Sequence, residues 1–262
     1  MSVIGYKIAK NGTNRVIVTL EIPEDAKTNM NRSSIAVKET AKYRANKAKV
    51  LTIEDDSGIS YTTATSFEYD KESHTYNVGE TIEESSYDPD PEKVDGEGIY
   101  YFLTRRVAEL YGLIELENGL YEAWYDNGQK CEEVNYVDNE YNGLYRTWHS
   151  NGQKEAEIKY VNGKEEGLSE FWYDNGQKCK EIWCDDDGKL TFFKSWYENG
   201  QKYAEATRVD YKLHGLYQSW HENGQKYKEI NYEDGNFHGL YQEWNENGTL
   251  VKEVNYFNGF IV

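Results

Sequence analysis

The C-terminal part of the chain repeats one short pattern of hydrophobic, polar and turn-forming positions. The repeated unit reads G-L-Y-x-x-W-x-x-N-G-Q-K-x-x-E-I-x-Y and is followed by a turn rich in Asp, Asn and Gly. An Asn-Gly pair between two aromatic or β-branched segments is the strongest short signal for a β-hairpin, because both residues tolerate a positive φ. Each unit therefore predicts one hairpin.

The units recur every 24 residues and fill residues 119–262, with starts at 119, 143, 167, 191, 215 and 239. No proline interrupts this stretch, so every strand can pair on both sides. The predicted fold class is mainly β: an elongated, single-layer antiparallel β-meander of about 12 strands, stabilised by contacts between neighbouring repeats. The tryptophans are expected to form the structural core of the repeats: Trp124, Trp148, Trp172, Trp196, Trp220 and Trp244.

The loop at the Asn-Gly pair allows two registers. A two-residue loop would place Glu122 opposite Glu133, an unfavourable pair of like charges. A three-residue loop over 126–128, with its glycine in the left-handed conformation, pairs Tyr125 with Gln129 instead. We favour the three-residue loop, since a slip of one residue would move apolar side chains to the wrong face.

The favoured loop predicts which side chains share a face of the sheet. It places Lys130 opposite Trp124, where the lysine stem can cover the ring. One face is expected to carry Leu120, Trp124, Val134 and Tyr136. The glutamates on the other face could form only a solvated ladder, but we predict that this face binds protein, through Tyr121, Tyr125, Glu133, Tyr145, Glu157, Tyr173, Glu181, Tyr197, Glu205, Tyr217, Glu229, Tyr241 and Glu253.

Residues 1–112 lack the repeat and are predicted to form a small α+β domain, with the array occupying 113–262. Alternation of apolar and polar residues predicts strands in a hairpin over 3–22, at 48–53, at 98–103, and once or twice within 60–80. One short helix is expected within 24–47 and another at 105–111, with Thr104 as its N-cap.

Composition changes the picture in two respects. A hydrophobic content of 38% and a formal charge of −18 lean towards disorder, but an aromatic content of 15% argues for a folded chain. Residues 111–262 hold 28 acidic and 15 basic residues, a net charge of −13. An array this acidic repels phosphate backbones, so we expect no nucleic-acid partner and regard membrane binding as disfavoured.

The three cysteines form no disulfide framework, and the opening residues lack the apolar stretch of a signal peptide. We therefore expect an intracellular, reducing location and no secretion. Candidate chemistry is sparse. His149 and His221 occupy the slot that is tyrosine in other repeats, and Asp185 opens an acidic turn rather than a calcium loop. We predict a protein that is not an enzyme, with no catalytic residues, cofactor or metal site.

The G-L-Y-x-x-W-x-x-N-G-Q-K core over residues 119–262 resembles the MORN variant repeat. The resemblance implies a binding scaffold, because members of that family act mainly in this way. Some bacterial relatives are antitoxin-like, and MORN proteins have also been linked to phosphoinositide membranes. The resemblance thus favours a protein partner over a catalytic role.

Three stretches of the N-terminal part resemble an uncharacterised module of giant DNA viruses, where it is fused to various repeat arrays. The stretches are VIVTLEIPEDAK (16–27), YRANKAKVLTIE (43–54), and VGETIEESSYD (78–88) with GIYYFLTRRVAELY (98–111). The resemblance implies a viral origin, as a virion component or a factor in the host cytoplasm, and supplies no activity.

Three functional interpretations remain open. The leading one is a non-enzymatic scaffold for protein–protein interaction. The first alternative is an antitoxin-like neutraliser that binds a basic protein through its acidic surface. The second is an unrecognised enzyme in the N-terminal module. The last sheet edge of the array is also expected to permit self-association.

Overall fold

The computed structural model describes residues 1–67, 74–113 and 117–262. By its internal packing the chain divides into two units, which are described separately. Unit 1 comprises Met1–Ile114 and Glu122–Cys131, and unit 2 comprises Glu115–Tyr121 and Glu132–Val262. The domain boundary that the sequence suggests, between residues 112 and 113, stays a prediction.

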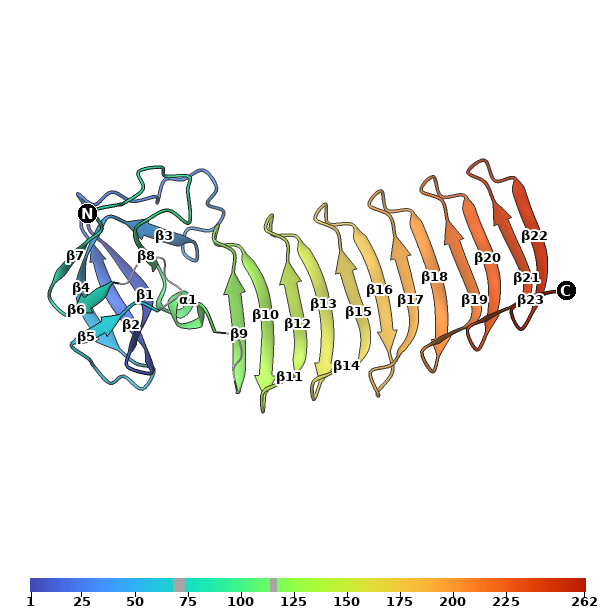
Figure 1. Cartoon of the computed structure of the whole chain (residues 1–262), viewed down its shortest axis with the longest axis horizontal. Coiled ribbons are helices and arrows are strands. Elements are labelled where there is room, and N and C mark those ends of the chain that lie inside the picture. Colours follow the sequence, from blue (N-terminus) through green and yellow to red (C-terminus); the bar gives the residue numbers. More distant parts are fainter. Residues whose placement is uncertain (68–73, 114–116) are drawn as a thin grey trace. The chain divides into compact units, whose positions relative to one another are not determined.

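Unit 1 is built on an eight-stranded antiparallel sheet that curls into a half-barrel (Figure 1). The main path of the sheet is β3-β8-β1-β2-β4-β7, and β5 pairs with both β1 and β6. The strands are β1 (Val3–Asn11), β2 (Asn14–Ile22), β3 (Lys42–Ala45), β4 (Lys47–Glu54), β5 (Thr63–Thr65), β6 (Thr75–Asn77), β7 (Thr81–Glu83) and β8 (Ile99–Phe102).

The strand predictions for unit 1 are confirmed. The hairpin over 3–22 forms as β1 and β2, and the other strands form as β4, β8 and the short pair β5 and β6. Residues 68–73 of the predicted 60–80 segment lie outside the described residues. The inner side of the curl is an apolar core in which Val18, Leu20 and Tyr101 are fully enclosed.

The prediction of an α+β domain is wrong, because the described part of unit 1 contains a single helix, α1 (Arg105–Leu110). Thr104 stands at its N-cap, but the Thr104 side chain makes no capping hydrogen bond. Residues 24–47 form no helix. The backbone of this segment forms other hydrogen bonds instead. For example, the backbone Arg44 N donates to the side-chain Asn29 Oδ1 at 2.9 Å. Unit 1 is therefore mainly β.

The tip of the first repeat hairpin, residues 122–131, belongs to unit 1. Asp126 O accepts a hydrogen bond from Arg32 Nη2 at 2.5 Å. A Cβ atom on Gly128 would collide with Val37 O, so only glycine fits at this point of the tip. A loop of unit 1 thus holds the tip through contacts to its backbone.

Unit 2 is an open antiparallel sheet of 15 strands that follow one another in a row (Figure 1). The predicted meander is confirmed. The strands are β9 (Gly119–Trp124), β10 (Lys130–Val137), β11 (Glu140–Tyr141), β12 (Gly143–Trp148), β13 (Lys154–Val161), β14 (Lys164–Glu165), β15 (Gly167–Trp172), β16 (Lys178–Cys184), β17 (Leu190–Trp196), β18 (Lys202–Val209), β19 (Lys212–Trp220), β20 (Lys226–Glu233), β21 (Asn236–Trp244), β22 (Leu250–Phe257) and β23 (Phe260–Ile261).

The three additional strands are β11, β14 and β23, each only two residues long. They arise at the second turn of a repeat, where the chain folds back on the strand that it has just left; Val161 pairs with Lys164 in this way. Asn162 at this turn has a φ of 49°, the left-handed conformation that asparagine tolerates. The second turn is therefore a tight hairpin in its own right.

The three-residue loop at the Asn-Gly pair is confirmed. Tyr125 N donates to Gln129 O at 2.8 Å, and Gly128 N donates to Tyr125 O at 2.8 Å. Gly128 has a φ of 90°, as the left-handed position of this loop requires. The later repeats keep the same loop; in the second, His149 N donates to Gln153 O at 2.8 Å.

A β-bulge directly after the loop changes the register. Trp148 pairs with Lys154, as the loop predicts, but Thr147 pairs with Ala156, so that Glu155 is an extra residue. The same shift occurs beside Trp172, Trp196, Trp220 and Trp244. Because side chains alternate between faces, one extra residue moves the rest of the second strand to the opposite face.

The bulge makes the predicted face assignment wrong. In the second repeat Tyr145 pairs with Ile158, whereas Arg146 pairs with Glu157. The tyrosine of each G-L-Y segment therefore shares a face with the branched apolar residue of the second strand. The tyrosine that ends this second strand lies on the same face. The tryptophans share the other face with the glutamates. We call the first the aromatic face and the second the charged face of the array.

Candidate functional site

The charged face is held together by ion pairs and by lysines that lie over tryptophan rings. Lys154 Nζ lies 3.0 Å from Glu157 Oε2, and the same ammonium lies 5.0 Å from the centroid of Trp172 in the next repeat. The arrangement recurs at Lys178 with Glu181 and Trp196, at Lys202 with Glu205 and Trp220, and at Lys226 with Glu229 and Trp244. Each lysine thus joins two successive repeats.

The predicted glutamate column lies entirely on this charged face and already has partners within the chain. Arg146 binds Glu133 at 3.0 Å and Glu157 at 2.9 Å, and its guanidinium lowers the pKa of Glu157 below the ordinary value. In the last repeat, Gln242 Nε2 donates to Glu253 Oε2 at 2.8 Å. These carboxylates form ion pairs and hydrogen bonds within the array, so they are less available to bind a partner protein.

The Asn-Gly-Gln segments of the second to fifth loops each connect their repeat to the next one. Asn199 Oδ1 accepts from Gln201 N at 2.9 Å within the loop, and Asn199 Nδ2 donates to Glu222 O of the next loop at 2.8 Å. The Gln201 side chain packs against Gly224 of that loop, where a Cβ atom would meet its amide oxygen. The motif therefore has a structural role in joining repeats.

The slot after each tryptophan also joins repeats. Tyr173 Oη donates to Trp196 O at 2.7 Å, and Tyr197 Oη to Trp220 O at 2.9 Å. His149 Nε2 lies 3.0 Å from Trp172 O, so this histidine makes the contact that tyrosine makes elsewhere. Tyr173 and Tyr197 of the predicted binding set thus have a structural role, and the interpretation of His149 as an aromatic substitute is confirmed.

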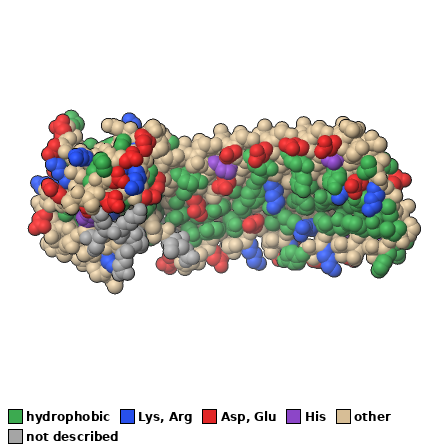
Figure 2. All heavy atoms as spheres, turned by 45° about the horizontal axis from the view of Figure 1, so that its top comes forward, with side chains coloured by type: hydrophobic (Ala, Val, Ile, Leu, Met, Phe, Trp, Pro, Cys, Tyr) green, Lys and Arg blue, Asp and Glu red, His purple; other side chains and the backbone are tan. Residues whose placement is uncertain are grey.

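The aromatic face carries the buried side chains of the array. Val134 is 1% exposed and Ile230 is 2% exposed, although no second layer covers the described part of this sheet. Aromatic rings on the same face enclose them in place of a second layer. Figure 2 shows hydrophobic side chains gathered in a band along the repeats. Of the predicted binding residues, the ones on this face are Tyr121, Tyr145, Tyr217 and Tyr241.

The rings form two clusters. The first runs over repeats one and two: Tyr121, Tyr136, Tyr141, Tyr145 and Tyr160. The second runs over repeats five and six: Tyr217, Tyr232, Phe237, Tyr241 and Tyr256. Between them Ser169 and Phe193 take the tyrosine slot, and Cys184 ends the strand. The aromatic face therefore has two matched ends and a different middle.

Burial keeps several of these tyrosines protonated. It raises the pKa of Tyr160 to about 12, with Glu165 adding to the shift, and raises the pKa of Tyr145 further beyond its usual range. Burial together with a hydrogen bond from its hydroxyl to Glu243 raises the pKa of Tyr241 to about 12. These hydroxyls therefore stay protonated to a higher pH than exposed tyrosine hydroxyls do.

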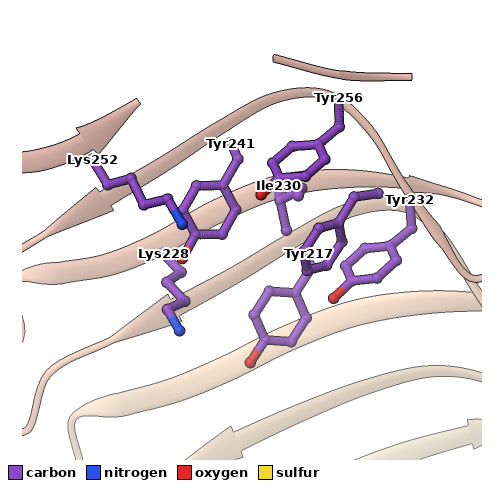
Figure 3. Close-up of a pocket in the computed structure, with 8 residues that line it drawn as sticks. Tyr217, Lys228, Ile230, Tyr232, Tyr241, Lys252 and Tyr256 are labelled. Carbon is purple, nitrogen blue, oxygen red and sulfur yellow. The ribbon is translucent and has the colours of Figure 1, made fainter. Parts of the chain in front are cut away.

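Two hollows open on the aromatic face. One of about 580 Å³ lies over the middle repeats and includes Ile182, Cys184 and Tyr211 in its lining. The other, of about 430 Å³, lies over strands β19–β22 and has aromatic walls (Figure 3). Burial raises the pKa of the Cys184 thiol, so this cysteine is a poor nucleophile. Within the described ranges, no three His, Cys, Asp or Glu side chains are placed to hold a metal ion.

Comparison of the repeats with one another offers a partial signal for the bulge. In the first repeat this pairing would set Glu122 opposite Glu133, and that like-charge pair is the reason for expecting a different register from the sequence. The corresponding positions pair Arg146 with Glu157 and Lys194 with Glu205, whereas the third repeat pairs Glu170 with Glu181. Opposite charges at two of the equivalent sites favour the observed register.

Comparisons with known families match the N-terminal region and the repeats to two different families. Residues 1–108 match a family of unknown function, DUF5758. Four segments match the MORN repeat variant, at residues 117–138, 141–162, 213–234 and 237–258. These are the repeats that carry the two ring clusters. No curated protein matches the chain. The viral origin finds no support in these matches and stays a prediction.

The matched segments and the geometry lead to the same description. The chain carries repeats similar to the MORN repeat variant within residues 117–258, and a preceding region similar to the DUF5758 family.

Proposed function

We propose that this is a non-enzymatic scaffold that binds a protein partner through the aromatic face of its repeat array. The supporting observation is the contrast between the two faces. The charged face pairs its lysines with its own glutamates, whereas the aromatic face presents clustered rings and two hollows. Large aromatic side chains give contact area at low entropic cost, which is why they are enriched at the energetic centres of interfaces.

Neighbouring residues on β19 provide a matched test, because they point to opposite faces. Tyr217→Ala removes a ring from the aromatic face, and Leu216→Ala removes an exposed side chain from the charged face. Full-length variants are used in affinity capture followed by mass spectrometry. Circular dichroism verifies that each variant is folded.

Partner recovery should fall at least about tenfold for Tyr217→Ala and stay within about twofold for Leu216→Ala, since truncating an aromatic side chain at the centre of an interface costs about 2 kcal/mol or more. Recovery that falls only with Leu216→Ala would move the proposal to the charged face. Equal recovery with both variants would reject it.

The remaining functional expectations stay predictions. An antitoxin-like role requires a basic partner whose complex dissociates steeply with salt. An enzymatic N-terminal module requires ligand-induced thermal shifts in the full chain that map to residues 1–108. No helix within the described residues is long and apolar enough to cross a membrane. Particle proteomics against host-cell lysate would test the predicted viral and intracellular setting.

A further inference from the structure

The hollow over β19–β22, which we call the C-terminal cavity, is lined by residues of the aromatic face only. Five rings wall it: Tyr217, Tyr232, Phe237, Tyr241 and Tyr256. Ile230 is the apolar residue between them (Figure 3). Its volume of about 430 Å³ lies within the range of small ligand pockets.

The walls of the cavity are preorganised by contacts between rings. Phe237 lies 5.2 Å from Tyr232 and 5.1 Å from Tyr256, both edge to face. Tyr217 and Tyr232 are 6.1 Å apart in a similar arrangement. A side chain entering the cavity would therefore meet ordered apolar surface, at little cost in ordering the walls.

Two lysines complete the lining, and they differ from the lysines of the charged face. Lys228 Nζ lies 4.4 Å from the Tyr227 ring centroid, and Lys252 Nζ lies 5.1 Å from that of Tyr241. Neither ammonium is within 4 Å of a carboxylate among the described residues. Glu243 pairs in register with both lysines, but its carboxylate accepts the hydrogen bond of Tyr241.

The balance of charge selects the class of ligand. Two ammonium groups and the single carboxylate of Glu243 give the site a local charge of about +1 in an otherwise acidic array. Aromatic cages often bind organic cations, but two ammonium groups in the lining would repel one. An apolar group with adjacent negative charges matches both the rings and the lysines.

We propose that the C-terminal cavity binds an acidic segment of a partner protein. An aromatic or aliphatic side chain of that segment lies among the rings, and carboxylates on either side of it pair with Lys228 and Lys252. This inference rests on the proposed function, since it assigns the partner chemistry of one end of the aromatic face.

The test uses the full chain with ¹³C-labelled isoleucine methyl groups. Ile230 reports on the cavity, and Ile158 occupies the same slot in the second repeat and serves as an internal control. The probe is the blocked peptide Glu-Glu-Phe-Glu-Glu. Two control peptides replace phenylalanine by alanine or every glutamate by glutamine.

The probe should shift the Ile230 methyl resonance in a saturable manner and leave that of Ile158 unchanged. Each control peptide should bind about tenfold more weakly, because it lacks either the buried ring or the ion pairs. The double variant Lys228→Met and Lys252→Met should weaken binding by about the same factor while keeping the lysine stems. Lys180→Met, on the same face two repeats earlier, should change binding less than about twofold.

No shift at Ile230, or equal binding of the glutamate and glutamine peptides, would overturn the inference. A shift that depends only on protein concentration would instead indicate that a second copy occupies the cavity, and would also overturn it. Either result leaves the proposed function standing if Tyr217→Ala still abolishes partner recovery. If the peptide does not bind at Ile230 and Tyr217→Ala also leaves partner recovery unchanged, then a binding role for the aromatic face is rejected.

Discussion

The two units use β-sheets in opposite ways. Unit 1 curls its sheet around a shared interior, where Leu20 and Tyr101 contact residues far away along the chain. Unit 2 leaves its sheet open and encloses its buried residues with rings from neighbouring strands. The hydrogen bonds between loops join residues 23 positions apart. We therefore expect a destabilising substitution to lower the stability of all of unit 1, but only that of the neighbouring repeats in the array.

The largest expected effect tests the shared interior. Arg44 is 0% exposed, and its guanidinium donates to the carbonyl oxygens of Lys93, Asp88, Asp90 and Glu97. Arg44→Met leaves these acceptors without their donor and should cost about 3–5 kcal/mol of unfolding free energy.

Urea unfolding followed by circular dichroism measures that cost, and hydrogen exchange should show lost protection over much of unit 1. Lys93→Met, which removes an exposed ammonium, is the control. If exchange increases only in the loop at 84–98, then unit 1 is as modular as the array and the comparison fails.

The next effect tests how closely successive repeats pack. Gly200 and Gly167 both have a positive φ, but a Cβ atom would meet the Gln177 amide only at Gly200. Gly167→Ala should cost about 1 kcal/mol through backbone strain alone. Gly200→Ala should cost about 1 kcal/mol more, because the Gln177 side chain must move.

Thermal unfolding of both glycine variants measures the difference. Hydrogen exchange should place the additional change of Gly200→Ala in the loops at 174–177 and 198–201. Equal destabilisation by the two substitutions would show that the glutamine contact contributes nothing to the coupling between repeats.

A similar but smaller effect concerns the asparagine ladder. Asn199→Ala removes the hydrogen bond to Glu222 O and the bond within its own loop, at a cost of about 1–2 kcal/mol. Asn247, in the last loop, has no partner for its side-chain amide among the described residues. Asn247→Ala should therefore cost less than about 0.5 kcal/mol. Chemical denaturation compares the pair, and equal costs would contradict a role for the ladder in joining repeats.

The smallest effect distinguishes the aromatic face from exposed tyrosines. The folded pKa of Tyr241 is raised to about 12 from an ordinary value of 10.0. The folded state thus retains a proton that the unfolded state loses, so this contribution is complete below pH 10 and disappears as the pH rises through about 12. Tyr241→Phe should reduce the alkaline loss of stability by about 1 kcal/mol. Unfolding at pH 8 and pH 11 measures it; an unchanged difference would indicate that the Tyr241 ring is solvated.

Much of the array could be predicted from the sequence, because its signals are local. The Asn-Gly pair specifies the loop, and Gly128 adopts the expected left-handed conformation. The sequence did not predict that tyrosines and glutamates lie on opposite faces, because no signal within a single repeat marks Glu155 as the extra residue of a bulge. Nothing in the sequence near Arg44 predicts that this residue is the centre of a buried hydrogen-bond network. Its acceptors lie more than 40 positions away, beyond any local pattern.

The sequence by itself determined the period, the hairpins and their loops, since each depends on residues that are close together along the chain. Only the tertiary structure decided which side chains share a face, how the sheet of unit 1 curls, and that two lysines and five aromatic rings line one cavity. Those outcomes depend on pairing between strands, and one extra residue in a strand reverses every side chain that follows it.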